Sequence, residues 1–266
     1  PLSKELNVMR QTMLFNGLEA IAFNKNHKNN DTLFYEFGRV YFYHKSNTEN
    51  PLEKYNEKKQ LALFASGNIV KPSWHSKEQP ADLYFIKAMA MNVMRRMGID
   101  INQLKSSENA TPELFSSQIT YYHNGEPFCD LGKINPAIVT QLDIKDDVFF
   151  ALLEWEKLIF DLPKQEVKYV EVSRFPEVRR DLALLIDSTV KYAEIERIAF
   201  ETEPALIKKV ELFDIYEGEN IGTNKKSYAV SFILQDEEKT LTENRIEDTM
   251  NRLIDAYKNK LNAILR

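Results

Sequence analysis

Apolar residues in the first half of the chain recur with helical spacing in two places. Between residues 9 and 22 they lie three or four positions apart, which is typical of a helix with one buried face. A second stripe covers residues 86–97, and this helix is expected to begin after Asp82 and to end at Gly98. Both stripes predict amphipathic helices that pack on a larger apolar surface.

Segments rich in aromatic and β-branched residues predict the strands of this half. The longest, residues 33–43 (LFYEFGRVYFY), predicts a strand in which Gly38 is either a bulge or a close backbone contact. Asn124-Gly125 predicts the tight turn of a hairpin. Further strands are predicted at residues 61–66, 115–122, 128–131 and 148–153. Together these patterns predict an antiparallel sheet with helices packed on it, an α+β domain.

The second half alternates strand and helix patterns in the order β-α-β-β-α-β. The strands are predicted at residues 180–187, 206–216, 226–235 and 263–266, and the helices at residues 192–202 and after an N-cap at Thr242. This order is the ferredoxin-like pattern. It predicts a four-stranded sheet with two helices on one face and an open second face, which RNA-recognition modules use to stack unpaired bases.

A domain boundary is predicted between these halves. Residues 161–172 carry a proline and alternating charges, and they follow a helix-like run at residues 155–160. The chain of 266 residues is long enough for two domains of ordinary size. We therefore predict one α+β domain over residues 1–165 and a ferredoxin-like domain over residues 170–266.

Composition narrows the possible functions. Hydrophobic residues make up 43% and charged residues 28% of the chain, as in ordinary globular proteins. The net charge of −5 argues against a protein that binds nucleic acid through bulk positive charge. The single cysteine, Cys129, fits a reducing compartment, so a cytoplasmic location is expected. No apolar stretch approaches the roughly 18–20 residues of a membrane span, so no membrane partner is expected.

No catalytic or metal-binding residue is predicted. The four histidines and Cys129 lack metal-ligand spacing, and surface or structural roles are the simpler interpretation. No serine lies in a G-x-S-x-G elbow, and neither a P-loop nor a G-x-G-x-x-G motif occurs. The acidic clusters at residues 146–147 and 236–238 are interpreted as solvated turns.

A basic and aromatic cluster precedes the first strand of the second domain. It contains Arg174, Phe175, Arg179 and Arg180. Arginine pairs with phosphates and stacks on bases, so this cluster is a candidate RNA contact. The alternative is a salt-bridged strand entry in which Arg180 and Asp181 pair with each other.

A second cluster lies where two strands of this domain face each other. Asp214 and Tyr216 are two residues apart, so their side chains share one face of the sheet. A carboxylate accepts hydrogen bonds from the edge of guanine, a tyrosine ring stacks on a base, and the Ser227 hydroxyl serves either polarity. Lys225 and Lys226 precede this serine. The alternative is a turn-capping aspartate beside a half-buried core tyrosine.

Four segments of the second half closely resemble the ferredoxin-fold anticodon-binding domain found at the C-terminus of bacterial phenylalanyl-tRNA synthetase β subunits. They are residues 173–187, 211–221, 225–230 and 239–242. Three segments of the first half resemble the class II synthetase-like domain of the same subunit, namely residues 9–22, 33–42 and 132–144. The resemblance therefore covers nearly the whole chain.

The resemblance implies partners and a division of labour. The family works as a heterotetramer of two α and two β subunits, in which the α subunit activates phenylalanine with ATP. The class II-like domain of the β subunit, here residues 1–165, would be a catalytically silent interface domain. Residues 130–160 indeed lack the G-x-G-x-x-R motif, and Arg39 lacks the usual arginine-x-glutamate loop. ATP and Mg²⁺ would belong to the parent complex, and this piece of it would hold no cofactor.

The resemblance also implies roles for single residues. Asp214, Tyr216 and Ser227 match the positions that contact the anticodon in the family. The remaining candidates would contact the RNA backbone or support the site: Arg174, Phe175, Arg179, Arg180, Lys225 and Lys226. The predicted function is a C-terminal part of the β chain that scaffolds the α/β assembly and binds the anticodon of tRNA(Phe). The alternative is a purely structural module without direct RNA contact.

Overall fold

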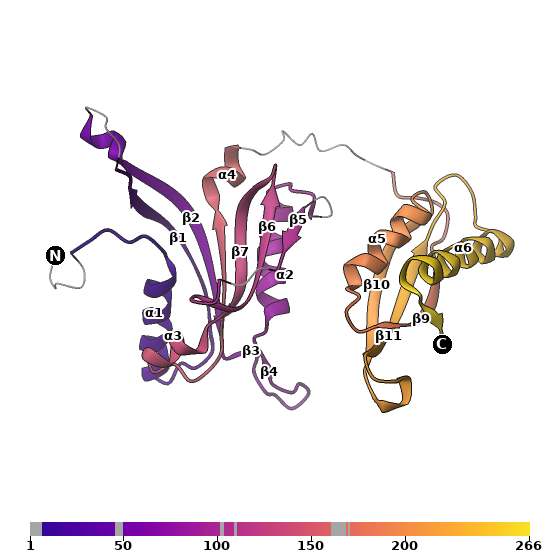
Figure 1. The fold of residues 1–266 in the computed structure, drawn as a ribbon, viewed down its shortest axis with the longest axis horizontal. Helices are drawn as coiled ribbons and strands as arrows, with labels where there is room; N and C mark the ends of the chain where they lie inside the picture. Colours follow the sequence, from indigo (N-terminus) through magenta and orange to yellow (C-terminus); the bar gives the residue numbers. More distant parts are fainter. Residues whose placement is uncertain (1–6, 46–49, 102–103, 109–110, 161–168, 170) are drawn as a thin grey trace. The chain divides into compact units, whose positions relative to one another are not determined.

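The structure, a computed structural model, divides the chain into two units, Pro1–Val167 and Lys168–Arg266 (Figure 1). The predicted boundary at residues 161–172 lies largely outside the described residues. The residues that the structure describes are 7–45, 50–101, 104–108, 111–160, 169 and 171–266. In this part of the chain, no helix combines the length and the apolar composition that a bilayer-spanning segment requires.

The first unit is built on a six-stranded antiparallel sheet with the strand order β1-β2-β8-β7-β6-β5. Its strands are β1 (Thr32–Tyr43), β2 (Tyr55–Ser66), β5 (Lys105–Ser107), β6 (Phe115–His123), β7 (Glu126–Ile134) and β8 (Val148–Glu154). A small separate hairpin consists of β3 (Asn68–Val70) and β4 (Gln79–Pro80). Because β2 and β8 are neighbours, the centre of the sheet joins segments that are far apart in the sequence.

Helices cover both faces of this sheet (Figure 1). They are α1 (Leu14–Asn26), α2 (Leu83–Arg96), α3 (Pro136–Gln141) and α4 (Trp155–Phe160), with a 3-10 turn η2 (Pro51–Lys54) before β2. One core lies between the sheet and α1 with α3, and it includes the buried ring of Phe64. The other lies between the sheet and α2 with α4, and it includes Cys129. Successive residues of the central strands point alternately into one core and the other, so both faces of these strands are apolar.

Two predicted features of this unit are refined by the structure. Helix α1 begins at Leu14 instead of near residue 9; its N-cap Met13 has no side-chain capping hydrogen bond, and the Thr12 hydroxyl accepts a hydrogen bond from the Leu14 backbone N–H at 3.2 Å. Gly38 is a close contact and not a bulge, since β1 and β2 pair without a register shift. A Cβ atom at Gly38 would lie 2.1 Å from the guanidinium of Arg10.

Other elements of the first unit were only partly visible in the sequence. Strand β2 begins at Tyr55, because its polar first half pairs with β1 in a two-stranded arm that needs no apolar face. Helix α3 was not predicted; Asn135 caps it by accepting a hydrogen bond from the Ala137 N–H at 2.9 Å. The hairpin turn is confirmed, with φ values of 52° at Asn124 and 83° at Gly125.

The second unit has the predicted element order β-α-β-β-α-β. Its elements are β9 (Val178–Asp187), α5 (Tyr192–Thr202), β10 (Ile207–Tyr216), the 3-10 turn η4 (Glu219–Ile221), β11 (Lys225–Leu234), α6 (Glu243–Leu261) and β12 (Ile264–Leu265). The antiparallel sheet has the order β10-β11-β9-β12. Helix α6 begins after Thr242 as predicted, although the threonine side chain makes no capping hydrogen bond.

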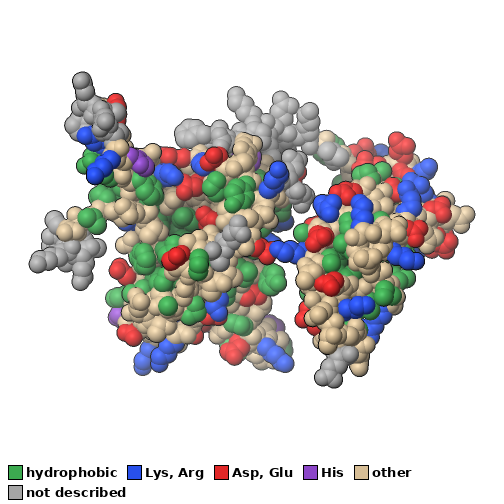
Figure 2. All heavy atoms as spheres, in the orientation of Figure 1, with side chains coloured by type: hydrophobic (Ala, Val, Ile, Leu, Met, Phe, Trp, Pro, Cys, Tyr) green, Lys and Arg blue, Asp and Glu red, His purple; other side chains and the backbone are tan. Residues whose placement is uncertain are grey.

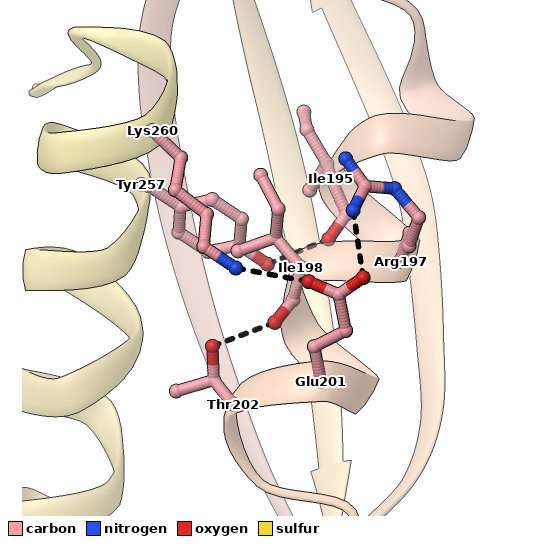
Figure 3. A network of polar contacts seen from close by, with 7 residues as sticks. All are labelled: Ile195, Arg197, Ile198, Glu201, Thr202, Tyr257 and Lys260. Carbon is pink, nitrogen blue, oxygen red and sulfur yellow. Dashed lines mark hydrogen bonds and ion pairs between the residues drawn. The ribbon is translucent and has the colours of Figure 1, made fainter.

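Both helices of the second unit pack on the same face of its sheet (Figure 1). The buried Tyr257 of α6 lies between them, and its hydroxyl donates a hydrogen bond to the Ile195 carbonyl of α5 at 3.0 Å (Figure 3). Burial raises the pKa of this tyrosine well above its usual value. At the surface, Glu201 accepts hydrogen bonds from both Arg197 and Lys260, which links the two helices a second time. The helix-covered face is therefore closed, and among the described residues of this unit no helix lies on the opposite face.

Candidate functional site

The open face of the second unit is defined by the register of its strands. Odd-numbered residues of β9 and β11 point to this face, because the even-numbered ones form the core with α5 and α6. In β10 the parity changes at a bulge between Leu212 and Asp214. Before the bulge Leu212 packs against the core, and after it Asp214 and Tyr216 point to the open face. The bulge is thus what presents the predicted pair outside the core.

The three residues predicted to contact the anticodon are neighbours on this face. Tyr216 pairs across the sheet with Ser227, and Asp214 pairs with Ala229, two residues further along β11. Asp214 is exposed, and its carboxylate makes no hydrogen bond or ion pair with any residue that the structure describes. Tyr216 is 39% exposed, whereas Ser227 is only 6% exposed. A ligand therefore reaches Asp214 and Tyr216 directly, but Ser227 only if a neighbouring side chain moves.

Arg266 is a further residue of this face that the sequence did not single out. Its backbone N–H donates a hydrogen bond to the Ala183 carbonyl at 2.9 Å, which extends the register of β12 by one residue. Its guanidinium carbon lies 5.4 Å from the centre of the Tyr216 ring. The arginine thus occupies the ring face on which a base could stack, and it brings a positive charge beside Asp214 and Ser227.

A polar and aromatic cluster lies on the same face beside the bulge. Asp181 accepts hydrogen bonds from the Ser231 hydroxyl at 2.6 Å and from the Arg179 Nε at 3.1 Å. These hydrogen bonds, first that of Ser231 and then that of Arg179, hold the pKa of the Asp181 carboxyl below its usual value. The Arg179 guanidinium also lies over the ring of Phe213, 5.5 Å from its centre. Phe213 is 54% exposed: it follows the core-facing Leu212 in the alternation of the strand, and the bulge places Asp214 on the same face as Phe213.

Two other candidate residues lie on the helix-covered face. Arg180 forms an ion pair with Glu243 at the start of α6, with a distance of 2.8 Å. The alternative interpretation paired Arg180 with Asp181. In the structure these two side chains do not pair, because neighbouring residues of a strand point to opposite faces. Lys226 is buried, with its ammonium 4.7 Å from the centre of the Tyr228 ring. The structure therefore does not bring these two residues to Asp214 and Tyr216.

The remaining candidates lie at the edges of the second unit. Arg174 is exposed and forms an ion pair with Glu171 at 2.7 Å. The carbonyl of Phe175 accepts a hydrogen bond from the Gln235 side chain at 2.8 Å, which fixes the segment before β9. Lys225 is exposed at the start of β11, where its cross-strand partner is Asp187. Of these, Lys225 is the residue placed by register on the open face.

The charge on this protein is mixed and not concentrated. Figure 2 shows lysine and arginine side chains interspersed with aspartate and glutamate on the visible face of each unit. On the open face of the second unit, Arg179, Lys225 and Arg266 share the sheet with Asp181 and Asp214. Such a surface favours recognition through base edges and stacking over neutralisation of many phosphates.

The buried titratable groups in the core of the first unit are shifted toward their neutral forms. In the part of the chain that the structure describes, no three histidine, cysteine, aspartate or glutamate side chains are grouped so as to hold a metal ion. Cys129 is completely buried, and burial raises the pKa of its thiol far above its usual value, so it is not a nucleophile. Burial likewise raises the pKa of Tyr121 to about 12.

Two family models match the chain in succession. Residues 1–155 match the phenylalanyl tRNA synthetase beta chain CLM domain. Residues 173–266 match the ferredoxin-fold anticodon binding domain. The second match contains all the residues of the open face described above.

Curated relatives match over the whole chain. The phenylalanine–tRNA ligase β subunit of Bacteroides thetaiotaomicron is 43% identical, with 100% of this chain and 33% of the relative covered. That of Porphyromonas gingivalis is 38% identical, with the same coverage of both chains. This chain thus spans about a third of the length of these relatives. Among solved structures, a pyrrolysyl-tRNA synthetase from Desulfitobacterium hafniense aligns with a TM-score of 0.42 and 14% identity over 57% of this chain and 49% of its own.

Proposed function

The chain belongs to the phenylalanyl-tRNA synthetase β-chain family, and from this premise we propose that it forms the part of a phenylalanine–tRNA ligase that reads the tRNA anticodon and scaffolds the enzyme. The second unit is the reader, and the first unit is a catalytically silent, class II synthetase-like scaffold. Activation of phenylalanine with ATP and Mg²⁺ takes place elsewhere in the assembly, on an α subunit. The observation that carries the proposal is the open sheet face on which Asp214, Tyr216 and Ser227 are neighbours.

The chemistry of this face suits an unpaired guanine. The free carboxylate of Asp214 can accept hydrogen bonds from the N1–H and the N2 amino group of the base. The Tyr216 ring provides a stacking surface, which in other proteins contributes about 1–3 kcal/mol per base. Because Arg266 lies over that ring in the free protein, a stacking base takes the place of the guanidinium. The displaced arginine is then available for a nearby phosphate, and Ser227 becomes accessible.

The first unit offers an apolar surface suited to a partner subunit. In the first half of β1, the alternating residues Leu33, Tyr35 and Phe37 are 50–68% exposed. These residues line a groove of about 600 Å³ between β1, β2 and α2, together with Met89 and Trp155. An exposed apolar groove beside an edge strand is typical of a protein interface. We assign this surface to the α/β contacts of an α2β2 assembly.

The test is a binding titration with anticodon stem-loops. Labelled stem-loops with the anticodon GAA and with a changed first base are titrated with the chain and with Asp214→Ala. We expect tighter binding of GAA by the original protein and loss of that preference in the variant, by roughly 1–3 kcal/mol. Asp248→Ala is the matched control, because it removes the same charge from an exposed position of α6 on the helix side. Equal discrimination by the original protein and Asp214→Ala contradicts the proposal.

One observation favours a second candidate function, a purely structural role without RNA contact. Phe213 and Ile264 expose 54% and 53% of their surface in the second unit, and a protein surface could cover them. In that case the stem-loops bind weakly and equally to the original chain and to Asp214→Ala. The same variant in the reconstituted ligase separates the two functions, since only an anticodon reader then loses aminoacylation efficiency.

A further inference from the structure

The most exposed large apolar side chain among the described residues lies far from any predicted site residue in the sequence. Trp74 is 97% exposed, in the loop between β3 and β4 of the first unit. Figure 1 shows this loop projecting from the body of that unit. Almost none of the ring surface is buried within the unit, so both ring faces are available to stack on a ligand.

The tip of this loop is ordered by its own hydrogen bonds. The Ser73 N–H donates to the Ser76 carbonyl at 2.9 Å, and the Ser76 N–H donates to the Ser73 hydroxyl at 3.2 Å. The Ser73 hydroxyl also lies 3.1 Å from His75 Nδ1. Trp74 and His75 thus occupy the middle of a closed turn, with their ring centres 4.9 Å apart. The tryptophan is presented in advance of binding, which lowers the entropic cost of the contact.

The surroundings of Trp74 indicate which class of partner it contacts. Lys71 and Lys77 flank the tip, and Lys77 forms no hydrogen bond or ion pair with any described residue. The Lys71 side chain is 76% exposed, and its ammonium forms a long ion pair with the Asp31 carboxylate, at 4.0 Å. The residues next to Trp74 are polar and exposed, so the ring is not part of a larger apolar patch of the kind that marks protein interfaces. An exposed aromatic ring flanked by lysines is an arrangement by which proteins bind single-stranded nucleic acids.

From this arrangement we infer that the β3–β4 loop is a second RNA contact, in which Trp74 stacks on an unpaired base and Lys71 and Lys77 neutralise the adjoining phosphates. The contact does not depend on anticodon reading, because Asp214 and Tyr216 belong to the other unit. Its ligand class is an unpaired nucleotide of an RNA such as the tRNA substrate of the family.

Tryptophan fluorescence tests this inference directly. The chain contains two tryptophans, and Trp155 is half-buried against Phe37, with ring centres 4.7 Å apart. In Trp155→Phe, Trp74 is the sole reporter, and stacking on a base quenches its emission. We expect a short oligoadenylate and a tRNA transcript to quench Trp155→Phe but not Trp74→Phe. If Trp155→Phe does not fold, the difference between the original chain and Trp74→Phe gives the same reading.

Affinity measurements supply the matched controls. Trp74→Ala is expected to weaken oligoadenylate binding roughly fivefold or more. Tyr84→Ala is the control, because it removes another exposed aromatic ring, 76% exposed on α2, and we expect it to change nothing. Asp214→Ala is expected to retain the quenching of Trp74, which separates failure of this contact from failure of anticodon reading. Absence of quenching overturns the inference, as does a blue shift of Trp74 emission on adding the α subunit without any response to RNA.

Discussion

Asp181 shows how single side chains control the chemistry of the open face. Its carboxylate lies between the Ser231 hydroxyl and the Arg179 guanidinium, and it is paired with both. This pairing orients Arg179, which in turn lies over Phe213. The position of two exposed side chains beside the proposed base-binding site therefore depends on a carboxylate that does not contact the base.

We predict that Ser231→Ala raises the pKa of Asp181, because the hydroxyl is the main cause of its lowered value. A carboxyl whose pKa is lowered by folding stabilises the protein above its unfolded pKa, and this contribution is lost as the pH falls through the folded pKa. Ser231→Ala therefore reduces stability above the unfolded pKa and weakens its dependence on pH in the acidic range. NMR titration of the Asp181 carboxyl carbon measures the pKa.

Asp187 is the internal control for this titration. Its pKa is also lowered, but by hydrogen bonds from Thr189, so Ser231→Ala should leave it unchanged. Equal movement of both carboxyl groups would show a general change of the unit instead of the loss of one hydrogen bond.

The sequence predicted part of this face, and the missing part has a physical reason. The two-residue spacing of Asp214 and Tyr216 places them on one face wherever the strand lies. Phe213 was missed, because alternation from Asp214 and Tyr216 assigns it to the opposite face, and only a bulge allows Phe213 and Asp214 to share one face. Arg266 was missed, because its contact with Tyr216 crosses the sheet from a strand of two residues. Neither a bulge nor a contact across two intervening strands has a signal in the local sequence.

At the scale of elements, helix α1 and strand β2 of the first unit approach each other unusually closely. Gly17 of α1 faces the ring of Phe64, and a Cβ atom at Gly17 would lie 2.0 Å from that ring. Phe64 is 2% exposed and packs against the rings of Phe34 and Phe150, so a shift of its ring would disturb these contacts. Glycine in this helix is thus required by packing and not by backbone conformation.

We predict that Gly17→Ala destabilises the first unit. Alanine improves helix propensity by about 1 kcal/mol, but overpacking a well-packed core costs typically about 1–3 kcal/mol. Because the neighbouring ring is enclosed by other aromatic rings, we expect the packing cost to exceed the gain. Denaturant unfolding measures the difference. The matched control is Asn16→Ala on the exposed side of the same helix, which should be neutral or slightly stabilising.

The predictability of the elements follows the same division between local and tertiary causes. The helix at residues 192–202 was predicted to its last residue, because its apolar stripe and its flanking segments agree. The first half of β2 was not predicted, since its residues are polar and only pairing with β1 makes them a strand. Helix α3 has six residues and too short a stripe to show a period. Hydrophobic periodicity in the sequence thus predicts the elements that are long enough to bury one whole apolar face, and it misses short or polar elements that form only through tertiary contacts.

At the scale of the whole molecule, each hydrophobic core is drawn from one unit only. The two cores of the first unit contain residues 13–158, and the core of the second unit contains residues 184–263. None of the described core residues is shared between them. Stability is therefore expected to be set separately in each unit, which suits a protein whose units have different proposed roles.

We predict two unfolding transitions that respond to different substitutions. Tyr257→Phe removes a buried hydrogen bond to the Ile195 carbonyl, at a cost of about 1 kcal/mol. In a unit of this size that lowers the midpoint by about 4–8 °C. Gly17→Ala should lower only the other transition, and the double variant should show both shifts unchanged, because distant sites without shared contacts act additively. Scanning calorimetry of the four proteins measures this. If either substitution moved both transitions together, the units would form one cooperative system, and binding on the open face of the second unit could then alter the stability of the scaffold.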